Sequence, residues 1–481
     1  MDFRPVFLIV GILLTTLAFG MCLPAMLDAY LRHPDWQVFA VSAGVTLFVG
    51  VTLILTCRTE TMRISVRQAF VVTTLSWISI TVFGALPFTF SELSLTYTDA
   101  FFEAMSGVTT TGATVITGLD TAPPGILLWR GILQWLGGLG IIVMTIAVLP
   151  VLRVGGMQMF RVEAFETGEK VMPRAAQISA ALSIIYVVLT ALCAVALSAA
   201  GMNALDATVH AMTTLSTGGY STRDASVGYF NSAMIDGIVT VGMIVGSLPF
   251  VLYLRVIQGQ GRELVRDSQV HWFLVILSLA IALTAFLLWF RNGVETTTAF
   301  RLAAFNVTSV MTGTGYATSD FWAWGGFAGP IFFYLMFIGG CTGSTTCGIK
   351  IFRFQVLYAA TQTQFHHLLR PHGVFIPYYN HRPIPDDVIT SVLSFFFLYG
   401  VSFAILAVAL GMLGLDFTTA VSSAATAISN VGPGLGPIVG PAGNFQALPD
   451  AAKWLLSAGM LLGRLELFTV LMLFTPFLWR A

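Results

Sequence analysis

The stretch Met311-Thr312-Gly313-Thr314-Gly315-Tyr316-Ala317 decides how the rest of the chain is interpreted. It is polar and rich in glycine, and it lies between a short segment, 301–310, and a long apolar run, 327–338. Such a turn cannot cross lipid by itself, because its backbone groups would lack hydrogen-bond partners. It can lie at membrane depth when its carbonyl groups face a cation-filled pore.

Three other turns align with this stretch without gaps when Gly315 is taken as position zero. Their glycines are Gly112, Gly219 and Gly432, and the residue three before the glycine is always a hydroxyl: Thr109, Ser216, Thr312 and Ser429. The glycines recur about every 100 residues, which leaves room for two membrane helices of about 20 residues and a shorter re-entrant helix. Ordinary Gly/Thr turns between helices are the alternative for any one turn, but four turns in register favour a four-part cation filter.

The composition places the chain in the membrane. Of its 481 residues 56% are hydrophobic and 10% are charged, whereas soluble domains carry about 25% charge. The predicted fold is therefore an all-α polytopic membrane protein. The net charge of zero gives no indication of nucleic-acid binding.

The apolar runs predict an N-terminal helix hairpin followed by four helix–pore-helix–helix repeats around a central ion pore. We place the hairpin and a cytoplasmic loop in 1–67 and the repeats in 68–175, 176–268, 269–384 and 385–481. The short pore helices are expected at 98–109, 205–216, 300–311 and 416–428. The second membrane helices are expected at 126–151, 231–256, 328–360 with an interruption, and 451–479.

Backbone carbonyls and hydroxyl oxygens must replace the hydration shell of a potassium ion, and glycine permits the turns that aim them inward. The predicted K⁺-binding residues are Thr110, Thr111, Gly112, Thr217, Gly218, Gly219, Gly313, Thr314, Gly315, Asn430, Val431 and Gly432. Glu103, His210, Asn306 and Ser423 share one aligned position, nine before the glycine, and are expected to hydrogen-bond behind the filter. Asp99, Asp206 and Asp416 are expected to cap the pore helices.

A second feature interrupts the apolar run after the third turn. Ten small or polar residues, 339–348, cannot lie in lipid as a helix but can form a loop against a water-filled cavity. We expect this loop to gate the pore, with a glycine-rich helix-packing seam as the alternative. The predicted gate residues are Gly340, Cys341, Thr342, Gly343, Ser344, Thr345, Thr346, Cys347, Gly348 and Arg464.

Arg464 lies midway along the apolar run 454–478, where a charge is costly and usually faces a cavity or a partner. It is expected to set a barrier in the pore or to hold the loop shut, with Glu466 as a candidate partner. A purely structural ion pair is the alternative. Lys and Arg gather mainly on the side of both termini, which predicts that both termini are cytoplasmic and that the filter turns face outward.

These four turns, the broken helix at 339–348 and Gly463-Arg464-Leu465-Glu466 together resemble the Trk/Ktr/HKT superfamily of potassium transporters over essentially the whole chain. The N-terminal hairpin makes the chain most similar to the bacterial Trk membrane subunit. The resemblance implies a homodimer in the bacterial inner membrane and a cytoplasmic ring of regulatory subunits that bind NAD or ATP. No motif for such nucleotides occurs in this chain, so we expect no cofactor here beyond K⁺ as the transported ligand.

Two other functions are alternatives to channel-like potassium uptake. A symporter coupled to H⁺ or Na⁺ usually needs ionisable residues near the midplane, and Arg464 and Glu466 are the main ones in this sequence. An intramembrane enzyme would need a nucleophile–base pair or a metal set within the spans, and the sequence has no such cluster. The chain is therefore predicted not to be an enzyme.

Overall fold

The computed structural model describes residues 2–59, 64–147, 155–157, 171–380 and 382–480. Residues 148–154 and 158–170 lie outside the described residues. They belong to the end of the first predicted repeat, whose boundary was placed at 175. Four cations of the predicted cytoplasmic side lie outside the described residues as well: Arg63, Arg153, Arg161 and Lys170.

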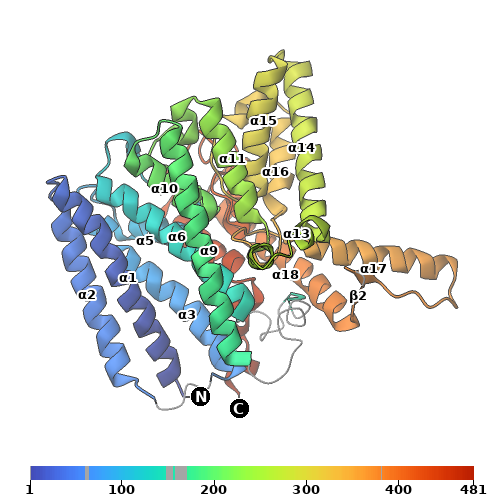
Figure 1. The fold of residues 1–481 in the computed structure, drawn as a ribbon, viewed down its shortest axis with the longest axis horizontal. Coiled ribbons are helices and arrows are strands. Elements are labelled where there is room, and N and C mark those ends of the chain that lie inside the picture. The colour runs from blue at the N-terminus through green and yellow to red at the C-terminus, as the bar shows by residue number, and fades with distance from the viewer. Residues whose placement is uncertain (1, 60–63, 148–154, 158–170, 381, 481) are drawn as a thin grey trace.

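The N-terminal hairpin is formed by α1 (Arg4–Tyr30) and α2 (Trp36–Thr56), which pack along each other at one side of the molecule (Figure 1). Two glycines allow this close approach, because a Cβ built on Gly11 would lie 2.8 Å from the carbonyl oxygen of Gly50. α1 also contacts α3 and α6, so the hairpin is attached to the first helices that follow it. This part of the prediction is confirmed.

Four short helices end at the glycine turns, as predicted: α5 (Tyr97–Val108), α10 (Ala204–Leu215), α15 (Thr296–Met311) and α19 (Phe417–Ser429). Each is preceded by a long helix: α3 (Val66–Gly84), α9 (Val171–Ala199), α14 (Ser268–Asn292) and α18 (Asp386–Met412). Each is followed by another helix: α6 (Pro124–Ala147), α11 (Ala233–Ser247), α16 (Ala328–Phe337) and α20 (Asp450–Arg464). The helix that ends one unit packs on the short helix of the next, and α20 returns to α5, so the four units form a closed ring.

Three of the helices that follow a glycine turn are broken. α11 bends by 93° into α12 (Phe250–Ile257), and α20 bends by 110° toward α21 (Phe468–Leu471) and the residues up to Phe474. α16 leads through the loop 339–348 into α17 (Ile351–Leu369), which extends away from the body at the right of Figure 1. The interruption at 339–348 was predicted, but the continuous helices expected at 231–256 and 451–479 were wrong.

The remaining elements are short. They are α4 (Leu86–Phe90), α13 (Arg262–Arg266), α22 (Pro476–Trp479), the 3₁₀ turns η1 (Leu119–Thr121), η2 (Ser226–Phe230), η3 (Phe321–Trp324) and η4 (Met472–Phe474), and the antiparallel strands β1 (Tyr378–Tyr379) and β2 (Arg382–Pro383).

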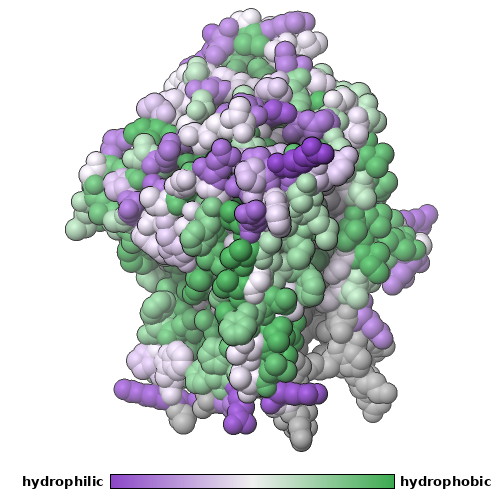
Figure 2. Space-filling model, turned by 90° about the vertical axis from the view of Figure 1, so that its left-hand side faces the viewer, coloured by the Kyte–Doolittle hydropathy of each residue, from purple (hydrophilic) through white to green (hydrophobic). Residues whose placement is uncertain are grey.

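The surface fits a membrane environment. Within the described residues seven helices are long and apolar enough to span a membrane, or up to nine if each bent pair counts as one span. Figure 2 shows the face that carries α1 and α2, with hydrophobic side chains over its middle and hydrophilic ones gathered toward its two ends. Large apolar residues of α1 and α2 such as Phe19 and Phe48 are exposed, which is costly in water but not in lipid. Both termini lie at the same end of the molecule (Figure 1).

Three of the four short helices, α5, α10 and α19, are capped by a side chain at their start, although not always by the predicted residue. Asp416 caps α19 by accepting the N–H of Thr419, and hydrogen bonds from Thr419 lower the pKa of Asp416. In α5 and α10 the caps are Thr96 and Asn203 instead, while Asp99 and Asp206 lie three residues later. A carboxylate in that first turn still stabilises the helix, because it lies near the positive end of the helix dipole.

Candidate functional site

The four glycine turns share one backbone conformation. At the glycine, φ is positive in every strand: 87° at Gly112, 78° at Gly219, 84° at Gly315 and 101° at Gly432. Two residues earlier φ is again positive, at Thr110, Thr217, Gly313 and Asn430, whereas the residue between them is not in this region. A positive φ is unusual for threonine. Its β-branched side chain makes this left-handed backbone conformation unfavourable by about 1–3 kcal/mol.

Each turn is tied to the end of its own short helix by the same hydrogen bond. The N–H of the residue before the glycine donates to the carbonyl six residues before the glycine, at 2.8–3.1 Å. The pairs are Thr111 to Ser106, Gly218 to Thr213, Thr314 to Ser309, and Val431 to Thr426. The four turns are therefore equivalent in backbone structure despite their different side chains.

The four turns also follow one another around a ring. A Cβ built on Gly112 would collide with the carbonyl of Gly218, one on Gly219 with that of Thr314, and one on Gly315 with that of Val431. The ring closes at Gly432, where the Cβ would lie 3.0 Å from the carbonyl oxygen of Thr111. No side chain fits between these strands, which gives the aligned glycines a structural reason.

One end of this ring opens into a pocket, which we call the vestibule. All four glycines line it, together with Arg130, Arg223 and Asp224 among others. The opposite end carries the hydroxyl residues, where the Thr110 hydroxyl lies 3.9 Å from the sulfur of Cys347. The predicted filter residues are thus brought together, between the vestibule and the loop 339–348.

The loop 339–348 is held against the glycine turns and against the break in α11. All its residues except Gly348 are buried. The Thr345 hydroxyl donates to the carbonyls of Leu215 and Gly246 at 3.0 and 2.9 Å, and it accepts from the hydroxyl of Thr217. Gly343 accepts the N–H of Phe250, the first residue of α12. The predicted loop residues therefore form one irregular segment packed against the second glycine turn.

Arg464, at the end of α20, reaches this loop with a side chain that is only 2% exposed. Its Nη1 donates to the Thr345 carbonyl at 3.2 Å and contacts the Cys347 sulfur, while its Nη2 donates to the Gly137 carbonyl at 2.9 Å. Arg464 was predicted to lie near the loop, and the structure brings the two together.

The suggested pairing of Arg464 with Glu466 is wrong. Glu466 accepts instead from Nη2 of Arg353 in α17, at 2.5 Å, and Arg353 is also bonded to the carbonyl of Gly155. The reason is the break after α20, where Glu466 and Leu467 have φ of 60° and 49° and turn the chain away from Arg464. Arg353 was not predicted as a site residue, and its side chain is fully buried.

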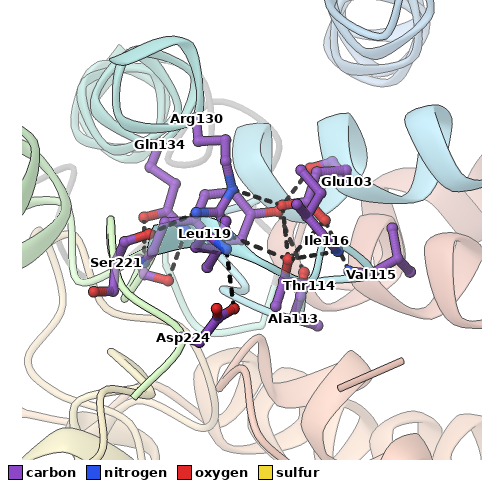
Figure 3. Close-up of polar contacts among 12 residues, drawn as sticks. Glu103, Ala113, Thr114, Val115, Ile116, Leu119, Arg130, Gln134, Ser221 and Asp224 are labelled. Atoms are coloured by element: carbon purple, nitrogen blue, oxygen red, sulfur yellow. Dashed lines mark hydrogen bonds and ion pairs between the residues drawn. The ribbon is translucent and has the colours of Figure 1, made fainter. Parts of the chain in front are cut away.

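The side chains aligned nine before the glycine differ in what they contact. Glu103 accepts from Arg130 and from the Thr114 hydroxyl behind the first strand (Figure 3). His210 is bonded to the Ser221 hydroxyl, and Asn306 donates to that of Thr318. The Ser423 hydroxyl has no partner among the described residues. Three of the four therefore hydrogen-bond behind the turns, as expected.

Two polar residues of α6, Arg130 and Gln134, contact the second strand and were missed as site residues (Figure 3). Both lie in the apolar run 126–147, and a charged or amide side chain at such a depth was the available signal.

Comparison with known proteins identifies the family to which the chain belongs. Residues 36–480 match the sequence family described as "TrkH: Cation transport protein". The chain belongs to the TrkH cation transport family. The family consists of transport proteins, so the prediction that the chain is not an enzyme is confirmed.

Similar proteins match over nearly their full length. The chain is 46% identical to the Trk system potassium uptake protein TrkI of Halomonas elongata, over 99% of this chain and 97% of that protein. It is 37% identical to the Trk system potassium uptake protein TrkH of Escherichia coli K12, over 100% of both. The crystal structure of the potassium transporter TrkH from Vibrio parahaemolyticus superimposes with a TM-score of 0.92 at 35% identity, covering 100% of both chains. This TrkH-family chain therefore has the multi-span helical fold of that transporter.

Proposed function

We propose that the chain is the membrane subunit of a Trk-type potassium uptake system and conducts K⁺ through a channel-like pore at the ring of glycine turns. The observation that carries this proposal is the repeated alternation of positive and ordinary φ in four strands that close a ring. Such strands can present successive rings of carbonyl oxygens to one ion, which is how backbone filters replace a hydration shell. The names of the related proteins, which are potassium uptake proteins, support the choice of ion.

Selectivity for K⁺ over Na⁺ is assigned to twelve residues of the four strands. They are Thr110, Thr111, Gly112, Thr217, Gly218, Gly219, Gly313, Thr314, Gly315, Asn430, Val431 and Gly432. The short helices direct their C-terminal ends toward these strands, and the negative end of a helix dipole favours a cation.

Gating is assigned to the loop 339–348 and Arg464. The loop packs against the strand ends away from the vestibule, and Arg464 links it to the carbonyl of Gly137 in α6. Conduction then requires the loop to move away from the filter. The contacts of Thr345 with Leu215 and Gly246 are the ones that such a movement must break.

The vestibule faces outward in this proposal, and both termini are cytoplasmic. The excess of Lys and Arg on the side of the termini supports this orientation. As a Trk-type subunit the protein is expected to form a homodimer and to bind a cytoplasmic ring of nucleotide-binding subunits. The extended helix α17, which follows the loop 339–348 directly, is suited to transmit movement from that side (Figure 1).

Ion flux into liposomes that contain the purified protein alone tests this function. We expect ⁸⁶Rb⁺ uptake that exceeds ²²Na⁺ uptake and that persists in both directions without a proton or sodium gradient. Empty liposomes and a Gly219→Ala variant serve as controls. Uptake that requires an H⁺ or Na⁺ gradient would contradict the channel mechanism and indicate a symporter. Equal uptake of Rb⁺ and Na⁺ would contradict a potassium filter.

A further inference from the structure

The inner face of α6 carries two polar side chains that reach the filter from behind. Arg130 and Gln134 are four residues apart, so they project from the same side of the helix. Both are buried, with exposures of 1% and 0%. Figure 3 shows them pointing together toward the second filter strand. A buried polar group is stable only when it is hydrogen-bonded, and these two side chains find most of their partners on backbone atoms of that strand.

Gln134 holds the two peptide groups that flank the filter glycine of strand two. Its Nε2 donates to the carbonyl of Gly218 at 2.6 Å, and its Oε1 accepts the N–H of Tyr220 at 3.0 Å. One amide therefore fixes the peptide planes on both sides of Gly219, in the manner of a neighbouring β-strand. Neither plane can rotate without breaking one of these two hydrogen bonds.

Arg130 binds the next residue of strand two and also contacts a residue of α5, the short helix that precedes strand one. Its Nη1 donates to the carbonyl of Ser221 at 2.6 Å, and its Nε donates to Glu103 at 2.8 Å. Its guanidinium lies 4.0 Å from the ring centre of Tyr220, a cation–π contact. The Tyr220 hydroxyl in turn donates to the carbonyl of Ala113, just after the first filter glycine. The separation of strands one and two is thereby set through side chains of α6 and α5.

The other strands are held differently. The carbonyls that correspond to that of Gly218 belong to Thr111, Thr314 and Val431, and none of them accepts a side-chain hydrogen bond from the part of the chain that the structure describes. Strands three and four rely on hydroxyls of their own short helices, as in the bonds from Ser309 to Tyr316 and from Thr426 to Gly432. The amide from another helix is thus a special feature of strand two.

We propose that Gln134 is a specificity-determining positioning residue of the filter, which holds the Gly218 carbonyl at the distance that suits K⁺ and prevents it from closing on the smaller Na⁺. The inference rests on the proposed function, because it concerns the selectivity of the same pore. Arg130 and Glu103 keep strand two in register with strand one, so that the carbonyl held by Gln134 stays within the ring. Gln134 itself does not contact the ion.

The test replaces Gln134 by leucine and, separately, by methionine, which preserve volume and remove both hydrogen bonds. Each purified variant is reconstituted and assayed for ⁸⁶Rb⁺ and ²²Na⁺ flux, with Rb⁺ dependence measured at several concentrations. Gln355→Leu is the matched control, since Gln355 is a buried glutamine of α17 whose side-chain oxygen has no hydrogen-bond partner among the described residues. Elution as a single species and a cooperative thermal unfolding transition show that a variant is folded.

We expect the Rb⁺/Na⁺ flux ratio to fall about three- to tenfold in both Gln134 variants, as the loss of a neutral hydrogen bond would produce. The half-saturating Rb⁺ concentration should rise by a similar factor, while Gln355→Leu keeps the wild-type ratio. A wild-type ratio in either folded Gln134 variant would overturn the inference, and so would an equal fall in the Gln355 control. Absence of selective flux in the wild-type protein would instead contradict the proposed function.

Discussion

Replacement of Arg464 by alanine tests whether the loop 339–348 closes the pore. Arg464 donates to the Thr345 carbonyl of the loop at 3.2 Å and to the Gly137 carbonyl of α6 at 2.9 Å. Its side chain therefore fastens the loop to the surrounding helices at the end of the filter away from the vestibule. Removing it releases this connection and also removes a positive charge from the proposed path of the cation.

The size of the effect follows from the bonds that are lost. A hydrogen bond that involves a charged group contributes about 1.5–3 kcal/mol. Loss of the bond to Thr345 alone should shift the balance between closed and open loop by about 13- to 160-fold, at 1.36 kcal/mol per factor of ten. Arg464→Lys keeps the charge but not the planar fork that reaches two carbonyls, so its effect should be intermediate.

The assay is the initial rate of ⁸⁶Rb⁺ uptake into liposomes, normalised to the amount of folded protein. We expect at least about a tenfold increase for Arg464→Ala, provided that the open state is rare in the wild type. Arg291→Ala is the control, because Arg291 is an exposed arginine near the end of α14 and far in sequence from the loop. An Arg464→Ala rate equal to that of the wild type would remove Arg464 from the gate.

Three further changes test other parts of the account. Gly219→Ala should abolish Rb⁺ uptake, since the added Cβ meets the Thr314 carbonyl at a positive φ, whereas Gly237→Ala, with nothing within 4 Å, should leave uptake unchanged. Arg353→Met leaves Glu466 buried without its partner and should lower the unfolding free energy by about 3–5 kcal/mol, seen as a lower Tm. Adding Glu466→Gln to it should recover much of that loss, and a double variant no more stable than the single one would argue against the pair. Deletion of 342–346 should give uptake without control by the loop, and tightly closed liposomes with folded protein would contradict this.

The position of the four equivalent glycine turns could be predicted from the sequence because glycine has a specific backbone role. Gly112, Gly219, Gly315 and Gly432 align, and each has the positive φ that glycine adopts at little cost. The positive φ at Thr110 and Thr217 could not be predicted, because threonine rarely adopts it. It is imposed by the ring, in which each strand must match its neighbours.

The two bends after α11 and α20 differ in whether the local sequence indicates them. Pro249 marks the break after α11, because proline cannot donate a helix hydrogen bond and restricts the residue before it. The break after α20 contains neither glycine nor proline, and Glu466 and Leu467 adopt positive φ there. The partner of Glu466 could therefore not be predicted. The pairing depends on a turn that the local sequence does not indicate, and the partner, Arg353, lies 113 residues away in the chain.

The most direct test of a four-stranded cation site is to locate the ion. Crystals of the purified protein grown in Rb⁺ would be measured at the rubidium absorption edge, and an anomalous difference map would show where Rb⁺ is bound. The account predicts peaks on the axis enclosed by the backbone of Gly112, Gly219, Gly315 and Gly432, which weaken when Na⁺ replaces Rb⁺. A map with no peak between these strands, or with its strongest peaks at carboxylates elsewhere, would contradict the central claim.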